Sequence, residues 1–276
     1  MSRLRKFAGQ FFVQGILLTW LLFILFPMVI VLSLSVRPIQ EIYIPTLLPP
    51  TVVFDNYVFA WEDAKMDRLF LNSAIVTGLS LLVTLFVSSL AAFAFGRRRF
   101  IAGAFLFSFI MLGFLMPKNV AVIPLFINLR TFDLLNSHLA LIIPYVSFTI
   151  PLAVIILTDF FRQIPNDLED AGRIDGCTDF QLYWSIMLPI ASPALTAVAV
   201  LLFLTNWNEF IFATTFIFDQ SLRTMPAGIM QFTGESREFL GPVSAAVVIS
   251  SAPVLLFYLA FQQTFIDGVA AGAVKE

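Results

Sequence analysis

The sequence predicts an all-α integral membrane protein, because apolar residues dominate it and charged residues fall in clusters between long apolar runs. Of the 276 residues, 59% are hydrophobic and 12% are charged, and the mean hydropathy is +0.91. A soluble domain of this size cannot bury so much apolar surface. About twenty helical residues cross the hydrocarbon core of a bilayer. Runs near or above that length and free of Lys, Arg, Asp and Glu lie at about 7–36, 69–96, 100–117, 134–158, 180–208 and 239–266.

These runs predict six transmembrane helices in a single membrane domain, residues 1–276. The predicted spans are about 11–36, 70–96, 101–127, 138–158, 190–215 and 242–266. Arg3, Arg5 and Lys6 precede the first run, so the N-terminus is expected in the cytoplasm. An even number of spans then places the C-terminus there too, together with the segment 159–189.

The third run is irregular. Pro117 and Pro124 fall in or just after it. Proline removes a helix hydrogen bond and clashes with the preceding turn, so an unbroken helix from 100 to 129 is not expected.

The fifth run ends in polar residues that are costly to expose to lipid: Asn206, Trp207, Asn208 and Glu209. Two interpretations remain open. These side chains line the outer half of a transport pathway, or Trp207 belongs to an interfacial aromatic belt with solvated neighbours.

The segment 159–189 is polar and holds six of the eighteen acidic residues. Asn166 followed by Glu169 is a capping-box pattern, and Gly176 is a stop signal. This spacing predicts a helix over 166–175.

Thr178 and Gln181 repeat the capping-box pattern and predict a second helix, which reaches about Met187 before Pro189. The first helix carries a narrow face of mostly small residues, which suits docking into a groove of a partner. The residues of that face are Leu168, Ala171, Gly172 and Asp175.

Within this segment stand Asp170-Ala171-Gly172, then Gly176 after three residues, then Ile186-Met187-Leu188-Pro189 after nine. The pattern resembles the cytoplasmic loop motif of ATP-binding-cassette (ABC) importer permeases, Glu-Ala-Ala, three residues, Gly, nine residues, Ile-x-Leu-Pro. Asp170 replaces the expected Glu, with Glu169 just before it, and Gly172 replaces the second Ala.

The resemblance implies a type I ABC importer permease fold whose cytoplasmic coupling-helix loop docks on an ATPase subunit. The residues that it assigns to ATPase coupling are Glu169, Asp170, Ala171, Gly172, Asp175, Gly176, Ile186, Leu188 and Pro189. The tail residues Gly272, Ala273, Val274 and Lys275 resemble the C-terminus of the maltose-type branch, which contacts the ATPases. Asn56-Tyr57 and Asn72-Ser73 also resemble this sugar-importer branch.

The implied partners are a sister permease, two ATPase subunits that carry ATP and Mg, an extracytoplasmic solute-binding protein and the lipid bilayer. The implied location is a bacterial or archaeal cytoplasmic membrane. Neutral amides and aromatics in nearly uncharged spans favour a sugar or oligosaccharide as solute. Another ABC importer branch (for a polyol, a glycerol phosphate or an amino acid) and an ion-coupled secondary transporter are the alternatives.

Catalytic chemistry on this chain is not expected. The sequence has no Gly-Lys pair and hence no Walker A motif. A single His138 and a single Cys177 provide neither a metal cluster nor a nucleophile–base pair, so we expect no metal site and no cofactor on this chain. We also expect no nucleic-acid binding, since the net charge is −2.

Overall fold

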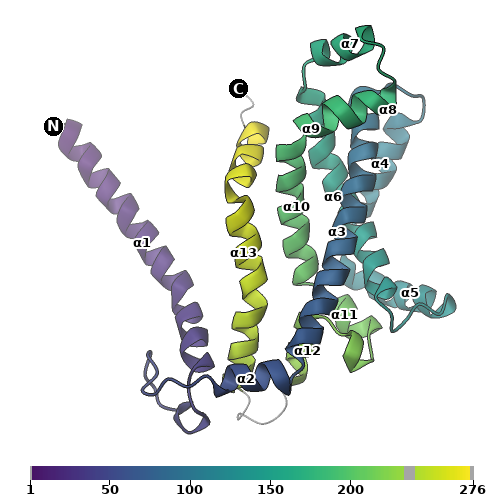
Figure 1. Ribbon diagram of the computed structural model, residues 1–276. Helices are drawn as coiled ribbons and strands as arrows, with labels where there is room; N and C mark the ends of the chain where they lie inside the picture. Colours follow the sequence, from purple (N-terminus) through teal and green to yellow (C-terminus); the bar gives the residue numbers. More distant parts are fainter. Residues whose placement is uncertain (1, 233–239, 274–276) are drawn as a thin grey trace. The chain divides into compact units, whose positions relative to one another are not determined.

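The computed structural model describes residues 2–232 and 240–273, with the side chains of 10, 12–230 and 240–263. The regular elements in these residues are helices (Figure 1), and no strand occurs among them. Contacts divide the chain into two compact units, residues 1–67 with 229–252 and residues 68–228 with 253–276. The prediction of an all-α protein is confirmed.

Helices occur along the whole of the described chain. In chain order they are α1 (Ser2–Ser35), η1 (Ile39–Glu41), α2 (Asp55–Glu62), α3 (Met66–Arg97), α4 (Gly103–Phe114), α5 (Lys118–Thr131), α6 (Leu139–Gln163), α7 (Asn166–Ile174), α8 (Asp179–Gln181), η2 (Leu182–Met187), α9 (Leu188–Ile190), α10 (Ser192–Trp207), α11 (Ile211–Phe216), η3 (Gln220–Leu222), α12 (Met225–Phe232) and α13 (Leu240–Ala273).

Four helices in the described residues are long and apolar enough to cross a membrane, or up to six if each of two bent helix pairs counts as one span. That count is consistent with the six predicted spans. The four are Phe12–Ser35, Met66–Arg97, Leu139–Gln163 and Leu240–Gln263, and the bent pairs are Gly103–Phe114 with Lys118–Thr131 and Asp179–Ile190 with Ser192–Trp207.

The break predicted in the third span is confirmed. α4 ends at Phe114, α5 begins at Lys118, and the two helices meet at an angle of 100°. Pro117 stands at the N-cap of α5, where its missing N–H costs nothing. The fifth predicted span also breaks, because α10 ends at Trp207 and α11 begins only at Ile211. An uninterrupted helix over 190–215 is therefore not what the chain forms.

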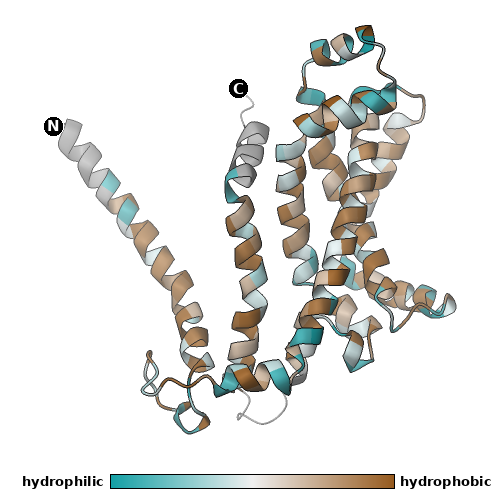
Figure 2. Cartoon of the chain, viewed as in Figure 1, coloured by the Kyte–Doolittle hydropathy of each residue, from teal (hydrophilic) through white to brown (hydrophobic). Residues whose placement is uncertain are grey.

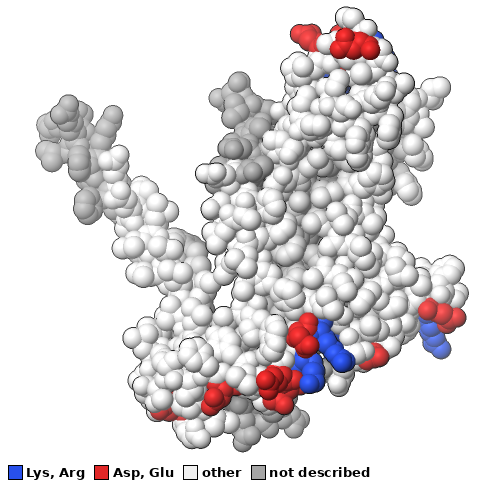
Figure 3. Space-filling model, in the orientation of Figure 1, with Lys and Arg blue, Asp and Glu red and all other residues white. Residues whose placement is uncertain are grey.

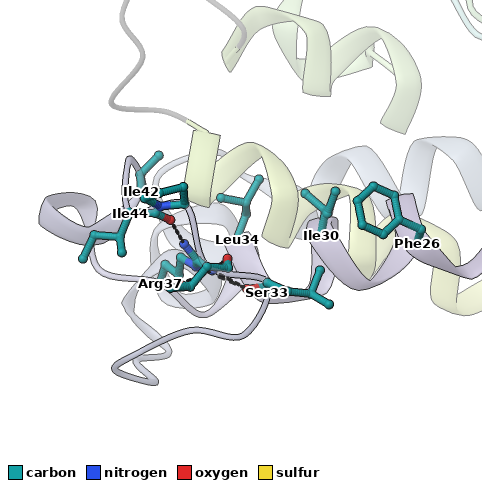
Figure 4. Close-up of a pocket in the computed structure, with 10 residues that line it drawn as sticks. Phe26, Ile30, Ser33, Leu34, Arg37, Ile42 and Ile44 are labelled. Atoms are coloured by element: carbon teal, nitrogen blue, oxygen red, sulfur yellow. Dashed lines mark hydrogen bonds between the residues drawn. The ribbon is translucent and has the colours of Figure 1, made fainter.

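A buried arginine organises the connection that follows α1 in the first unit. Arg37 is 2% exposed and donates hydrogen bonds to the Oγ of Ser33 and the carbonyl oxygens of Ile44, Thr46 and Leu48. This side chain lines a cavity of about 360 Å³, and Figure 4 shows it with the other lining residues. Because its donors are directed at backbone carbonyls, the guanidinium replaces the missing secondary structure of this loop.

The second unit has two apolar clusters, and its long helices are mostly hydrophobic while α7 and α8 are rich in polar residues (Figure 2). One cluster joins α3, α6, η2 and α10 through residues that include Phe93, Leu157, Phe161, Tyr183, Met187 and Leu202. The other joins α3, α5, α6 and α11 through residues that include Val76, Leu129, Tyr145, Phe212 and Phe216. α3 and α6 contribute to both clusters, so they connect the two ends of this unit.

One end of α3 is hydrogen-bonded to residues 221–225, where α12 begins. The Asn72 amide donates to the carbonyl oxygens of Ser221 and Arg223 at 2.8 and 2.9 Å, and the Ser73 hydroxyl accepts a hydrogen bond from the Met225 N–H at 2.8 Å. These bonds satisfy backbone groups that have no helix partner.

Gly228 lies against α3 next to the hydrogen bonds of Asn72 and Ser73. We predict that Gly228→Ala destabilises the protein. A Cβ atom at residue 228 would collide with the side chain of Leu69. Overpacking of this kind costs about 1–3 kcal/mol of folding free energy, which a melting experiment on the purified protein would detect. Gly78→Ala is the matched control, because a Cβ there meets no atom within 4 Å. Equal melting temperatures for the two variants would contradict the close contact.

Candidate functional site

The candidate site is the coupling loop, which we define as residues 159–189, together with the break between α10 and α11. The first helix of the loop, α7, spans Asn166–Ile174 and confirms the predicted helix. Its predicted capping box is wrong. Pro165 occupies the N-cap, no side chain caps the helix there, and Glu169 is directed to arginines instead.

The end of α7 is a Schellman motif. The Gly176 N–H donates to the Arg173 carbonyl at 3.1 Å, and the Cys177 N–H donates to the Gly172 carbonyl at 2.9 Å. Gly176 has a φ of +81°, a conformation that glycine adopts without strain. The predicted stop signal is confirmed.

The second helix of the loop begins with the predicted capping box, which is confirmed. The Thr178 hydroxyl accepts from the Gln181 N–H at 3.3 Å, and the Gln181 side chain accepts from the Thr178 N–H at 2.8 Å. The helix then runs on past Met187 to Ile190 through a π-helical stretch, η2. Wider π-helical hydrogen bonding is compatible with Pro189, which has no N–H to donate.

Gly172 packs against the second helix of its own loop. A Cβ atom at this residue would lie 2.6 Å from Leu182 Cδ2 and 2.8 Å from Ile186 Cδ1. The small residue is therefore needed for contact within the loop, whereas the sequence alone suggested contact with a partner. Ala171 on the same helix is exposed.

Glu169 is the centre of an ionic cluster that we call the Glu169 cluster: Arg97, Arg98, Glu169, Arg173 and Asp179. Arg97 Nε lies 3.1 Å from Glu169 Oε2, and Arg173 Nη2 lies 3.1 Å from Oε1, which also accepts from Arg98 Nη1. Burial alone would raise the pKa of the Glu169 carboxyl, but hydrogen bonds from Arg98, Arg173 and Arg97 hold that pKa below its usual value.

The exposed side of α7 carries three apolar residues, with acidic side chains between and beside them. Ile174 is 86% exposed and Leu168 is 41% exposed, with exposed Ala171 between them in sequence. Figure 3 shows acidic side chains gathered over this helix, where Asp167 and Asp170 are exposed. We call Leu168, Ala171 and Ile174 the α7 face.

The other residues predicted for coupling are spread over the loop. Asp175 and Gly176 are exposed at the end of α7, Ile186 and Leu188 are half-buried, and Pro189 is exposed. A second exposed apolar feature is the stacked ring pair of Phe180 and Trp184, whose centroids are 6.2 Å apart.

The polar residues at the end of α10 differ sharply in environment. Asn206 is 3% exposed, and neither atom of its side-chain amide has a hydrogen-bond partner in the described part of the chain. Trp207 is buried against Phe203 and Phe70. Asn208 is exposed, and its amide donates to the Leu204 carbonyl at 2.9 Å. Of residues 206–209, Asn208 is the one with an exposed side chain.

Glu209 explains the break between α10 and α11. Its carboxylate accepts hydrogen bonds from the N–H groups of Phe212 and Ala213, at 2.9 and 3.2 Å, and from the hydroxyl of Tyr145 at 2.9 Å. The first N–H groups of a helix lack partners, and a carboxylate satisfies them while complementing the helix dipole. Glu209 thereby starts α11 and ties it to α6.

The C-terminal residues are only partly described. Gly272 and Ala273 lie in the last turn of α13, and Val274 and Lys275 lie outside the described residues.

Sequence reasoning missed Arg97 and Arg98 as site residues. The Arg97–Arg98–Arg99 triplet directly follows the second predicted span, and three consecutive arginines together with an acidic segment at 159–189 are a usable signal of ion pairing.

We predict that Glu209→Ala lowers the melting temperature far more than Tyr145→Phe. The first change leaves the Phe212 and Ala213 N–H groups and the Tyr145 hydroxyl unsatisfied, at about 1–3 kcal/mol for each buried group. The second change removes one donor and leaves the other two bonds intact. Similar effects for the two variants would contradict a capping role for Glu209.

We also predict that the stabilisation by Glu169 disappears in acid. The pKa of this carboxyl is lower in the folded chain than its usual value of 4.5. Its contribution is therefore fully present above pH 4.5 and is lost as the pH falls through the lowered pKa. The difference in melting temperature between wild type and Glu169→Gln should shrink over that range. A difference that stays constant with pH would contradict the ionic contribution.

Comparisons with known proteins place this geometry in a family. Residues 84–269 match the family model described as binding-protein-dependent transport system inner membrane component. The chain is 32% identical over 274 residues to the diacetylchitobiose uptake system permease protein NgcG of Streptomyces coelicolor, covering 98% of this chain and 90% of that protein. It is 37% identical over 237 residues to the trehalose/maltose transport system permease protein MalG of Thermococcus litoralis, covering 85% and 81%.

The fold is also similar to a chain in the crystal structure of a bacterial ABC transporter involved in the import of the acidic polysaccharide alginate. The TM-score is 0.83 at 22% identity, over 95% of this chain and 98% of that chain. The fold, the apolar helices and the matched residues together show that this multi-pass membrane protein belongs to the family of inner membrane components of binding-protein-dependent transport systems.

Proposed function

We propose that this permease forms half of the translocation pathway of an ABC importer for a sugar or oligosaccharide, and that its coupling loop connects ATP hydrolysis on separate subunits to alternating access. The relatives NgcG and MalG are named for uptake of diacetylchitobiose and of trehalose or maltose. Nearly uncharged spans with neutral amides suit a neutral hydroxylated solute in the same way.

The observation that carries the proposal is the α7 face. Ile174 at 86% exposure and Leu168 at 41% project from a polar loop that its own chain holds firmly through Gly172 and Glu169. Exposed apolar side chains on a rigid polar element are a typical protein-docking surface. The ATPase subunit is the proposed occupant, and the acidic flanks favour a groove with basic residues at its rim.

The proposed assembly follows from the same features. A sister permease supplies the second half of the pathway, two ATPase subunits carry ATP and Mg, and a solute-binding protein delivers solute from outside, as the family description implies. The N-terminus, the coupling loop and the C-terminus lie on the cytoplasmic side, and the C-terminal residues contact the ATPases. Asn208, exposed where α10 ends, is the proposed contact of this chain with the pathway.

The environment of Glu209 argues against an ion-coupled carrier. Such a carrier needs an intramembrane acid that exchanges its ligands during transport. Both carboxylate oxygens of Glu209 already accept hydrogen bonds from α6 and α11. Glu209 therefore acts as a structural residue that joins α6 to the start of α11.

The experiment that tests the proposal is ATP-driven uptake by the purified complex. The chain is isolated from native membranes with its bound subunits, reconstituted in proteoliposomes and supplied with its solute-binding protein and radiolabelled sugars. We expect co-purification of an ATPase and a second permease, and accumulation of a sugar only with ATP. Uptake of a polyol or amino acid instead would move the protein to another importer branch, and uptake without ATP would overturn the proposal.

We predict that Ile174→Asp reduces co-purification of the ATPase by about tenfold or more. Burial of an Ile side chain contributes about 1.5–3 kcal/mol to an interface, and 1.4 kcal/mol is a factor of ten in affinity. The matched control is Ile101→Asp, because Ile101 is also fully exposed but lies outside the coupling loop. Equal retention of the ATPase by both variants would contradict docking through the α7 face.

A further inference from the structure

We propose that Glu169 acts within this chain as a positioning residue, which locks the coupling loop to the end of α3 so that α7 and α3 move as one body. This inference rests on the proposed function, and it changes the role of Glu169 from a contact for the ATPase to a connection inside the permease. α3 then becomes the element that carries the movement of the loop across the membrane.

The direction of the Glu169 side chain is the first argument. The side chain is 12% exposed, and both of its oxygens are occupied by arginines of the same chain. Asp170, the next residue, is exposed and forms no ion pair among those found in the described residues. A carboxylate that already binds three guanidinium groups has little capacity left for a partner protein.

The end of α3 is fixed by further contacts. Arg97 Nη1 donates to the carbonyl oxygens of Ile164 and Phe161, at 2.9 and 3.5 Å, where α6 turns into the coupling loop. At Gly96 the two helices approach so closely that a Cβ atom would lie 3.1 Å from Phe161 Cβ. Arg97 thus holds the entry to the loop from the same point from which it binds Glu169.

Asp179 extends the lock to the second helix of the loop. Its Oδ1 lies 2.8 Å from Arg98 Nη2 and 3.3 Å from Arg173 Nη2. Arg98 therefore bridges α7 and α8, and Arg173 bridges them a second time. The Glu169 cluster joins three helices with one set of charges.

The charges of the cluster explain why Glu169 is its centre. Three guanidinium groups meet two carboxylates, and Asp179 is largely exposed whereas Glu169 is not. Arg97 Nη2 and Arg98 Nε are buried without a hydrogen-bond partner in the described residues. If Glu169 were neutral, three like charges would face one another in a partly buried site, and α7 would separate from α3.

The other end of α3 is attached to a second segment of the chain. There, Asn72 and Ser73 hold the segment 221–225 through three hydrogen bonds. Both attachments lie on α3, which is one continuous helix of 32 residues. A displacement of α7 by the ATPase is therefore transmitted along α3 to the segment before α12, a rigid-body coupling between two distant points.

The test compares Glu169→Gln with wild type in the reconstituted complex, with Asp159→Asn as the matched control. Asp159 belongs to the same loop, but its ion pair with Arg162 is long at 3.7 Å and exposed on both sides. We expect Glu169→Gln to retain the ATPase subunit and its ATP hydrolysis while the solute transported per ATP falls about tenfold, within the usual range of coupling effects. Asp159→Asn should transport as wild type does.

A distance measurement reads the lock directly. Spin labels at the exposed residues Arg99 and Asp167, in a Cys177→Ser background, report the separation of the α3 end and α7 in the purified complex. We expect one narrow distance, the same with and without ATP, in wild type and in Asp159→Asn, and a broad distribution in Glu169→Gln. If Glu169→Gln does not assemble, Arg98→Gln takes its place, since it leaves Arg97 and Arg173 on Glu169.

Two results would overturn the inference. Loss of the ATPase subunit from both Glu169→Gln and Arg98→Gln, as in Ile174→Asp, would make the cluster a docking contact. A narrow, unchanged distance in these variants would show that α7 does not depend on it. A wild-type complex without ATP-driven uptake would instead overturn the proposed function, while the spin-label distances still decide whether Glu169 locks α7 to α3.

Discussion

The end of this permease that carries α7 and α8 depends on one carboxylate placed among three guanidinium groups. Taking a charge out of water is costly, and only close opposite charges with good hydrogen bonds compensate for that cost. Glu169 meets this condition through Arg173 of its own helix, Arg97 at the end of α3 and Arg98 directly after it. The same cost applies to the arginines, because their charges also require an opposite charge close by. As a result, ion pairs join the loop between two predicted spans to the end of α3.

The coupling loop divides its motif between two tasks. Gly172 and Glu169 face inward, where they allow close helix packing and ion pairing, and the α7 face is exposed at the site that we propose for a partner. The inward residues therefore keep the outward ones in a defined geometry. A surface that is held in a defined geometry before binding loses little conformational entropy when a partner binds.

A carboxylate also satisfies unpaired backbone N–H groups at the opposite end of the second unit. The break after α10 leaves helix N–H groups without partners, and Glu209 accepts two of them together with the Tyr145 hydroxyl. Irregular backbone near a membrane is tolerated only where such groups are satisfied by protein or water. Asn208 lies exposed at this break, next to Glu209.

The sequence by itself determined the helical membrane fold, the break at Pro117, the helix over 166–175 with its stop at Gly176, and the cap at Thr178. These features depend on composition and on neighbours a few residues apart, which sequence patterns record directly. Only the tertiary structure decided that Glu169 pairs with arginines instead of capping its own helix, that Gly172 packs against Leu182, and that Glu209 starts a helix. Each of these choices involves competition between a local hydrogen bond and a partner that packing brings close. Glu169 lies 71 residues from Arg98 in the chain, and no local pattern indicates which of the two alternatives has the lower free energy.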